Sequence, residues 1–317
     1  MWSPFLLILL CVAAQAQGEG QSISGPVLGF TREATGGAIW PIIGVPGAAM
    51  LAGRLQLEAE VRDVVISPTQ DFALAVRIDN GSVVAINTKA DPPVVTLVRG
   101  THSNPSAIGI SPTGSAAAIY DSETRSVQVV GHLPQGAEVL REFDLSGIEA
   151  RPTGMALSDD AAIVLVSFAD ELWAVDASGS WRVGSESSAT AAFLPNRHDA
   201  IVADDLTQTV VLMMNIDQSA TRVPVLSAAD GLESFSSVSV SRDGREVFIA
   251  GKSGRIAIVD MDTRRSVLTE CQCRPTGLHP LNQGPIFRLT DASGEPMTVL
   301  DYSSGKPQMF IIPPAAQ

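Results

Sequence analysis

Apolar residues occur along this chain in short blocks that are separated by turn-forming residues. Between Val238 and Thr263 the sequence VSVSRDGREVFIAGKSGRIAIVDMDT holds three apolar runs, with Asp-Gly and Ser-Gly between them. Runs of this length bounded by Gly, Asp and Ser predict β-strands. No segment of useful length has the three-to-four-residue periodicity of an amphipathic helix. The pattern therefore predicts an all-β chain.

The same order of runs and turns recurs six times. The copies are 37 to 47 residues apart, and their first apolar runs end at Ser67, Ser111, Ser158, Pro195, Ser241 and Leu281. Each copy has room for four short strands, and four strands every ~40–45 residues are typical of a propeller blade. The runs are apolar almost throughout because both faces of a blade are covered by neighbouring blades. We therefore expect a β-propeller.

Two more apolar runs, 27–31 and 38–44, precede the first complete copy. We interpret them as the third and fourth strands of a blade that lacks its first two. This predicts four-stranded blades, with seven blades favoured, one of them incomplete, and six blades possible. We expect the N- and C-terminal strands to pair and close the ring, since closure removes exposed sheet edges.

The clearest copy, VSRDGREVFIAGKSGRIAIVDMDTRRSV, resembles the YVTN-type β-propeller repeat of the WD40-like and lactonase-like propellers. The matching residues are Ser241, Asp243, Gly244, Asp260 and Thr263. The resemblance covers roughly 61–313 and departs from the pattern in the fourth copy (FLPNRHDA) and the sixth (PLNQGP). It implies the fold, whereas the functions in such families range from surface binding to lactone hydrolysis.

The N-terminus has the features of a signal peptide. An apolar stretch from Phe5 to Ala14 precedes the small-x-small pattern Ala14-Gln15-Ala16, although no Lys or Arg comes before it. We expect a signal peptide at 1–16, a mature N-terminal segment at 17–26, one propeller domain at 27–313 and a tail at 314–317. The mature protein would then be secreted, either periplasmic or extracellular.

Composition narrows the classes of function. The 317 residues are 45% hydrophobic, which is enough for a large core, and no segment beyond the N-terminus is long enough to span a membrane. Lys plus Arg number 21 against 34 Asp plus Glu, so the net charge is −13. A nucleic-acid binder needs the opposite balance. We expect a soluble monomer with an unknown protein or small-molecule ligand.

Candidate site residues gather in loops that a propeller brings to one face. The loops between second and third strands, and those between blades, emerge together near the channel mouth. The first set contributes Asp79, Asp121, Asp170, Asp204, Asp205 and Asp291, and the second contributes Arg99, His102, Arg151 and Arg274. A ring of carboxylates could hold Ca²⁺ or a cationic ligand, and like charges would raise one another's pKa values. The alternative is that these aspartates only form turns; no cofactor or metal site is predicted.

Cys271 and Cys273 form a C-Q-C motif. In an exported chain a disulfide is one expectation. In an extended strand their Cα atoms would lie about 6.5–7 Å apart, at the edge of bridging range, so a bridge requires a bend. Two thiols and His279 fall short of a closed zinc site.

No nucleophile elbow, metalloprotease motif, phosphate-binding loop or dinucleotide motif is present. We therefore favour an exported, non-catalytic propeller that acts as a binding or protein-interaction scaffold. The alternative is a lactonase-like hydrolase, because catalytic groups spread over several blades at the channel mouth leave no linear motif. Whether the protein is an enzyme stays open at this point.

Overall fold

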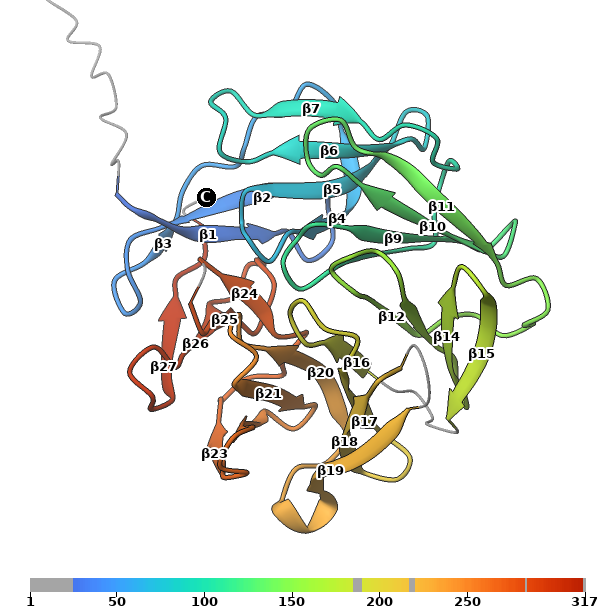
Figure 1. Ribbon diagram of the computed structural model, residues 1–317. Coiled ribbons are helices and arrows are strands. Elements are labelled where there is room, and N and C mark those ends of the chain that lie inside the picture. The colour runs from blue at the N-terminus through green and yellow to red at the C-terminus, as the bar shows by residue number, and fades with distance from the viewer. Residues whose placement is uncertain (1–24, 185–189, 217–219, 283, 316–317) are drawn as a thin grey trace, which may run out of the picture.

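Seven β-sheets form a ring in the computed structural model of the protein, which describes residues 25–184, 190–216, 220–282 and 284–315 (Figure 1). Six sheets have four strands and one has three. The fold is thus an all-β propeller of seven blades with one incomplete blade, which confirms the prediction. The expected signal peptide, 1–16, lies outside the described residues.

We number the blades in chain order. Blade 1 comprises β1 (Val27–Arg32), β2 (Ile39–Ile43) and β3 (Met50–Leu51), and blade 2 comprises β4 (Val61–Ile66), β5 (Phe72–Arg77), β6 (Val83–Asn87) and β7 (Val94–Leu97). Blade 3 comprises β8 (Ala107–Ile110), β9 (Ala117–Asp121), β10 (Ser126–Gly131) and β11 (Glu138–Asp144), and blade 4 comprises β12 (Gly154–Leu157), β13 (Val164–Ser167), β14 (Leu172–Asp176) and β15 (Gly179–Gly184). Blade 5 comprises β16 (Thr190–Phe193), β17 (Ala200–Asp204), β18 (Thr209–Met214) and β19 (Thr221–Ser227), followed by the short 3₁₀ turn η1 (Ala228–Asp230). Blade 6 comprises β20 (Phe235–Val240), β21 (Glu246–Gly251), β22 (Arg255–Asp260) and β23 (Ser266–Glu270), and blade 7 comprises β24 (His279–Leu281), β25 (Ile286–Arg288), β26 (Met297–Asp301) and β27 (Gln308–Ile312).

Every blade is an antiparallel meander whose strands pair in chain order. The first strands of neighbouring blades lie side by side around the central channel. Part of the channel is a cavity of about 180 Å³ with apolar walls that include Ile110, Met155, Ala191 and Val238. No helix within the described residues has the length and apolar character needed to cross a bilayer.

The Ser-x-Asp-Gly turn of blade 6 is explained by local hydrogen bonds. In blade 6 the Ser241 hydroxyl donates to Asp243 Oδ1 at 2.7 Å and accepts the backbone N–H of Glu246 at 2.8 Å. Asp243 also accepts the N–H of Arg245, and Gly244 adopts a φ of +75°, which favours glycine. These contacts lie within six residues, so the sequence alone determines this turn.

The core consists of seven apolar clusters, one at each junction between neighbouring blades. Strand β9 shows how both faces of a blade are used. Ala118 and Tyr120 belong to the cluster shared with blade 4, whereas Ala117 and Ile119 belong to the cluster shared with blade 2. This confirms that apolar runs were needed on both faces.

The prediction for the first blade was wrong in one respect. We interpreted the runs 27–31 and 38–44 as third and fourth strands, but β1 lies against β4 and β24 and is therefore the first strand. Within the described residues, it is the fourth strand that this blade lacks. The reason is that its third strand lies in the sequence Ala-Ala-Met-Leu-Ala-Gly, and Ala and Gly give a weak strand signal.

The prediction that the N- and C-terminal strands pair to close the ring was also wrong. Strand β27 pairs with β26 of its own blade, and β1 pairs with β2. Blades 1 and 7 are joined by an apolar cluster and by backbone hydrogen bonds, from Ala34 N–H to Ala292 O at 2.9 Å and from Ala292 N–H to Arg32 O at 3.1 Å. The ring is therefore closed by packing and two backbone hydrogen bonds between blades 1 and 7, and not by a blade that combines strands from both ends of the chain.

The buried side chain of Gln70 links three blades at the same junction. Its Oε1 accepts the backbone N–H of Phe30 in blade 1, and its Nε2 donates to the carbonyl of Pro280 in blade 7, each at 2.6 Å. Since Gln70 belongs to the turn between β4 and β5 of blade 2, its side chain links this turn to the first strands of blades 1 and 7.

Candidate functional site

We call the face that carries the loops between second and third strands, and the loops between blades, the connection face. The predicted aspartates lie in these loops, but most of them are engaged with near neighbours. Asp79 forms an exposed ion pair with Arg77, whose Nε donates to Oδ1 at 3.0 Å. This hydrogen bond is the largest contribution that lowers the pKa of Asp79. Asp170 is exposed at the rim of blade 4.

Asp121 and Asp204 are buried and serve their own turns. Asp121 accepts the backbone N–H of Glu123 at 2.7 Å. Asp204 accepts the N–H of Leu206 at 2.9 Å and the hydroxyl of Thr207 at 2.7 Å. Asx-type bonding of this kind holds the chain as it passes from the second to the third strand.

Asp205 connects two blades. Its carboxylate accepts the backbone N–H of Phe235 and the ammonium of Lys252, each at 2.8 Å, and both partners belong to blade 6. In the six complete blades, the loop between the second and third strands contains an acidic residue in every blade except blade 6, and Lys252 lies in that loop. The pair therefore neutralises both charges at the junction of blades 5 and 6.

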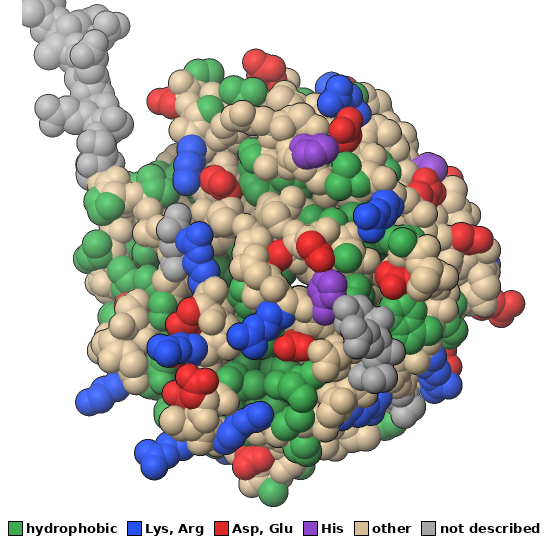
Figure 2. Space-filling view, in the orientation of Figure 1, with side chains coloured by type: hydrophobic (Ala, Val, Ile, Leu, Met, Phe, Trp, Pro, Cys, Tyr) green, Lys and Arg blue, Asp and Glu red, His purple; other side chains and the backbone are tan. Residues whose placement is uncertain are grey.

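The basic candidates are also distributed. The backbone of Arg99 pairs with the start of β11, and its side chain lies 3.3 Å from the carboxylate of Glu138. His102 Nε2 lies 2.9 Å from Glu142 Oε1. Arg151 is exposed in the loop between blades 3 and 4. Figure 2, which shows one face of the molecule, likewise has acidic, basic and histidine side chains interspersed, with a hollow near its centre.

Four of the predicted residues do come together, in a cleft on the connection face between blades 6 and 7. The cleft has a volume of about 900 Å³. One wall is the loop from β23 to β24, and the other is the loop from β25 to β26. The predicted residues in its walls are Cys271, Cys273, Arg274 and Asp291.

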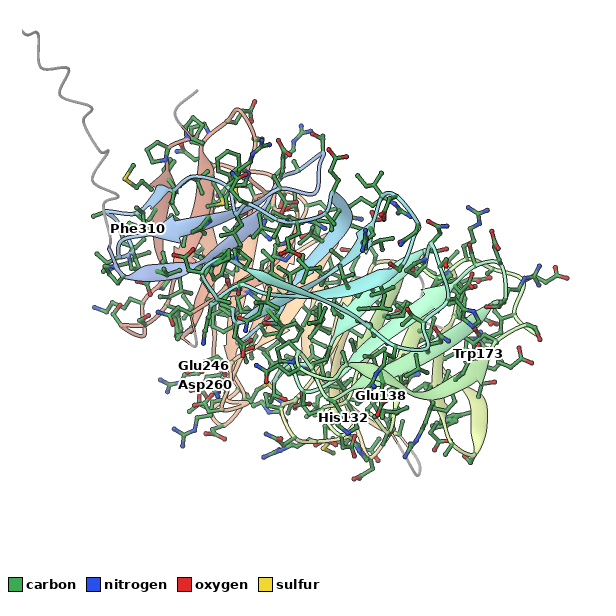
Figure 3. All side chains as sticks on the ribbon, turned by 90° about the horizontal axis from the view of Figure 1, so that it is seen from above. His132, Glu138, Trp173, Glu246, Asp260 and Phe310 are labelled. Atoms are coloured by element: carbon green, nitrogen blue, oxygen red, sulfur yellow. A yellow bond between two sulfur atoms is a disulfide. The ribbon has the colours of Figure 1, made fainter. Side chains whose placement is uncertain are left out.

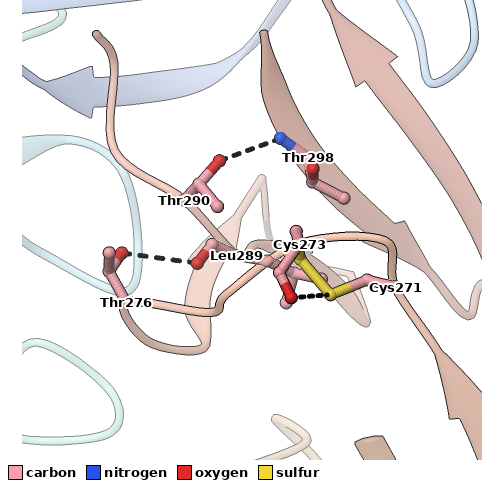
Figure 4. Close-up of a disulfide and its surroundings, with 6 residues drawn as sticks. All are labelled: Cys271, Cys273, Thr276, Leu289, Thr290 and Thr298. Atoms are coloured by element: carbon pink, nitrogen blue, oxygen red, sulfur yellow. Dashed lines mark hydrogen bonds between the residues drawn. A yellow bond between two sulfur atoms is a disulfide. The ribbon is translucent and has the colours of Figure 1, made fainter. Parts of the chain in front are cut away.

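The two cysteines form a disulfide in the wall of this cleft (Figure 4). Their Cα atoms are 5.1 Å apart, closer than in an extended strand, so the chain bends directly after β23 as a bridge requires. Gly254 makes the bend possible: it has a φ of +96°, and a Cβ there would lie 2.6 Å from the Cys273 carbonyl. The Gly254 carbonyl accepts the Cys271 N–H at 2.9 Å.

The inner end of the cleft leads to a buried charge cluster. Arg288 of β25 donates to Asp291, and the Arg288 side chain is 3% exposed. Arg32 of blade 1 approaches the same carboxylate with Nε and one terminal nitrogen, each at 3.4 Å. Burial is the largest influence on the pKa of Asp291 and favours the neutral form, but the two arginine charges outweigh it, so the pKa is lowered.

His279 pairs with Arg288 across β24 and β25, and the His279 Nε2 is buried without a hydrogen-bond partner among the described residues. Burial, followed by the charge of Arg288, lowers the pKa of His279 to about 3. Arg288 Nε also lacks a partner there. Neither Arg288 nor Arg32 was predicted as a site residue. The charged residue inside the apolar run PIFRLT was nevertheless a usable signal, because a buried charge requires a counter-charge.

The pKa values of the predicted aspartates do not show the mutual repulsion that was expected at the channel mouth. Wherever a shift is evident in the predicted set, at Asp79 and Asp291, an arginine lowers the pKa instead of a like charge raising it. Across the described ranges no three His, Cys, Asp or Glu side chains are grouped as metal ligands would be.

Comparison with known proteins supports the fold alone. No protein-family profile matches the sequence, and no curated protein matches it. Among solved structures, the chain is similar to a functionally unknown protein from Desulfotomaculum acetoxidans (15% identity over 90% of this chain and 100% of that one, TM-score 0.61). It is also similar to the RRP9 WD40 repeats (12% identity, 87% of each chain, TM-score 0.57) and to Kuenenia stuttgartiensis hydrazine synthase (13% identity, 93% of this chain and 98% of that one, TM-score 0.52). The chain is thus a seven-bladed, WD40-like β-propeller.

Proposed function

We propose that this propeller is a non-catalytic interaction scaffold that binds a polar peptide segment of a partner protein in the cleft between blades 6 and 7. One observation supports this most directly. The side chains of Glu270, Arg274 and Glu295 lie in the cleft walls and form no hydrogen bond or ion pair with any described residue. Most other charged groups of the connection face are already paired.

A cleft with free charges of both signs suits a ligand that carries both. Arg274 can donate two parallel hydrogen bonds to a carboxylate, and Glu270 and Glu295 can accept from Lys or Arg. A volume of about 900 Å³ is at the upper end of the usual range for ligand sites, which is about 300–1,000 Å³. Such an open and charged site matches a peptide segment better than a small apolar molecule.

We also infer that the protein acts outside the cytoplasm and that its repeats are of the YVTN type. The Cys271–Cys273 bridge supports export, because structural disulfides persist in oxidising compartments. The Ser241 and Asp243 turn in blade 6 supports the repeat assignment, since the motif residues make the hydrogen bonds of that turn.

Selection of displayed linear peptides on the purified protein tests the proposal. Selected peptides should bind the variant Glu270→Gln/Arg274→Gln/Glu295→Gln at least about tenfold more weakly, because three charge-assisted contacts are removed. A control variant, Lys89→Gln/Asp91→Asn/Lys306→Gln, also removes three exposed charges, but from the loops of the opposite face, and should bind as the wild type does. Peptides that bind the cleft variant with unchanged affinity would exclude the cleft as the site.

An activity assay on the same purified protein distinguishes the scaffold from the lactonase-like alternative. Hydrolysis of sugar lactones by the wild type, lost on His102→Ala or Asp204→Asn, would favour a hydrolase in place of a scaffold.

A further inference from the structure

The disulfide between Cys271 and Cys273 fixes a segment of the cleft wall that has few other ties. Strand β23 ends at Glu270, and the Cys271 N–H donates to the loop between β21 and β22 at 2.9 Å. The next backbone hydrogen bond along the chain is the one from the Thr276 N–H to the residue after β25, at 2.8 Å. Within the described chain, residues 272–275 form no backbone–backbone hydrogen bond. The bridge and side-chain packing therefore hold this segment in place.

The bridge also sets the spacing of two free charges in the cleft. Glu270 directly precedes it and is held by pairing of β23 with β22, whereas Arg274 directly follows it and is exposed. The Cα atoms of Cys271 and Cys273 are 5.1 Å apart. In an extended chain, residues two positions apart are separated by about 6.5–7 Å. Opening the bridge therefore allows Arg274 to move away from Glu270, while Glu270 stays in its strand.

The two cysteines differ in how readily a reagent in the cleft can reach them. Cys271 is 3% exposed and belongs to the apolar cluster between blades 6 and 7. Cys273 is half-buried, and both residues line the cleft. Exposed disulfides are reduced more easily than enclosed ones. A thiolate that enters the cleft should therefore attack the sulfur of Cys273.

The fold does not depend on this bridge. It joins residues only two positions apart, and the entropy that a disulfide removes from the unfolded chain decreases as the closed loop shortens. Blade 6 is held by strand pairing, which for β21 and β22 begins at Glu246 and Asp260, labelled together in Figure 3, and continues to Ala250 and Ile256. Reduction should therefore release the segment 272–275 and leave the blade folded.

We propose that Cys271–Cys273 is a thiol-exchange site, at which a dithiol protein of the same compartment reduces the bridge and so weakens peptide binding in the cleft. One thiolate of that protein bonds to Cys273 Sγ, and Cys271 leaves as a thiolate that takes up a proton. The second thiolate then attacks its partner sulfur in the mixed disulfide and releases Cys273. Two electrons pass to the bridge, so the dithiol becomes a disulfide and this chain gains two thiols. The exchange stands by itself, whereas its effect on binding rests on the proposed function.

Reduced thioredoxin and dithiothreitol are the probes for the exchange. Each is added to the folded full-length protein, free thiols are alkylated, and mass spectrometry of the fragment with both cysteines distinguishes it from Cys11. We expect reduction in native buffer with an unchanged circular-dichroism spectrum. Hydrogen exchange at the Cys271 amide should become about tenfold faster or more, because its loop is released. A bridge that these dithiols reduce only in denaturant would refute the proposal.

Two matched single variants test which sulfur is attacked. Cys271→Ser leaves the Cys273 thiol, and Cys273→Ser leaves the Cys271 thiol. An aromatic disulfide reagent should react about tenfold faster or more with the Cys273 thiol, because buried thiols react slowly. Equal or reversed rates would contradict attack at Cys273.

Cysteine-free peptides selected on the bridged protein measure the effect on the cleft. Reduction should weaken their binding about tenfold, and reoxidation should restore it. Cys271→Ser/Cys273→Ser should bind them as weakly as the reduced protein does, with no further change on adding dithiothreitol. Equal binding to the bridged and reduced forms would overturn the control of the cleft by the bridge. If no peptide binds either form, the proposed function fails, but reduction in native buffer with faster exchange at the Cys271 amide would still support the exchange site.

Discussion

The substitution Asp291→Asn removes one negative charge from the junction of blades 7 and 1 and keeps the shape of the side chain. Asp291 is 8% exposed and holds two arginines, Arg288 from its own blade and Arg32 from blade 1. The Arg32 side chain is 38% exposed and can turn toward water. Arg288 is 3% exposed and cannot, so its charge would stay buried without a counter-charge.

The size of the effect follows from that difference in exposure. Removing one partner of a buried ion pair costs about 3–5 kcal/mol, most of which is the penalty of the remaining buried charge. We therefore expect Asp291→Asn to lower the free energy of unfolding by about that amount. Replacing a buried pair with uncharged residues of similar volume is often neutral. The double variant Arg288→Met/Asp291→Asn should consequently be more stable than Asp291→Asn alone.

Urea unfolding followed by circular dichroism measures both quantities, with the slope checked for constancy between variants. Asp79→Asn is the control, because Asp79 also pairs with an arginine but is exposed, and its loss should not be measurable. If Asp291→Asn is as stable as that control, or if the double variant loses the sum of two single losses, then the buried charge of Arg288 is not what Asp291 compensates.

Three further outcomes follow from the same structure. The pKa of His279 is about 3 in the folded chain and 6.5 ordinarily, so between these pH values the unfolded chain binds a proton that the folded chain does not. The free energy of unfolding should therefore fall as the pH drops through this window, by at most about 1.4 kcal/mol per pH unit. Urea melts from pH 7 to 4 should show a flatter slope for His279→Gln. Replacing both Cys271 and Cys273 by Ser opens a very short loop, so the loss should be only about 1–2 kcal/mol in chemical denaturation, and a larger loss would mean that the bridge does more than close the loop. Gln70→Leu leaves the buried N–H of Phe30 without an acceptor and should cost about 1–3 kcal/mol, and unchanged thermal stability would show that water replaces the amide.

Much of the fold was determined by local sequence. Turns such as the one from Ser241 to Glu246 are held by local hydrogen bonds, and runs such as Ala117 to Tyr120 are apolar on both faces. Blades could therefore be predicted one at a time. Seven blades were favoured because six copies recur about every 45 residues and two further apolar runs, 27–31 and 38–44, precede them. The bend at Cys271 was an open alternative, because the sequence shows the two cysteines but not the Gly254 loop on which they pack.

Other features of the protein could be seen only in the tertiary structure, because they depend on contacts between residues far apart in the sequence. Arg32 and Asp291 meet across 259 positions, so neither residue reveals the other in sequence. Likewise, β1 is the first strand of its blade because it packs between β24 and β4, whereas its own residues suit any strand position. The cleft between blades 6 and 7 exists only once two loops from different blades face each other. Local hydrogen bonds and apolar runs specify a blade. The closing junction and the buried charge cluster instead depend on contacts between the first and last blades, which are far apart in the sequence.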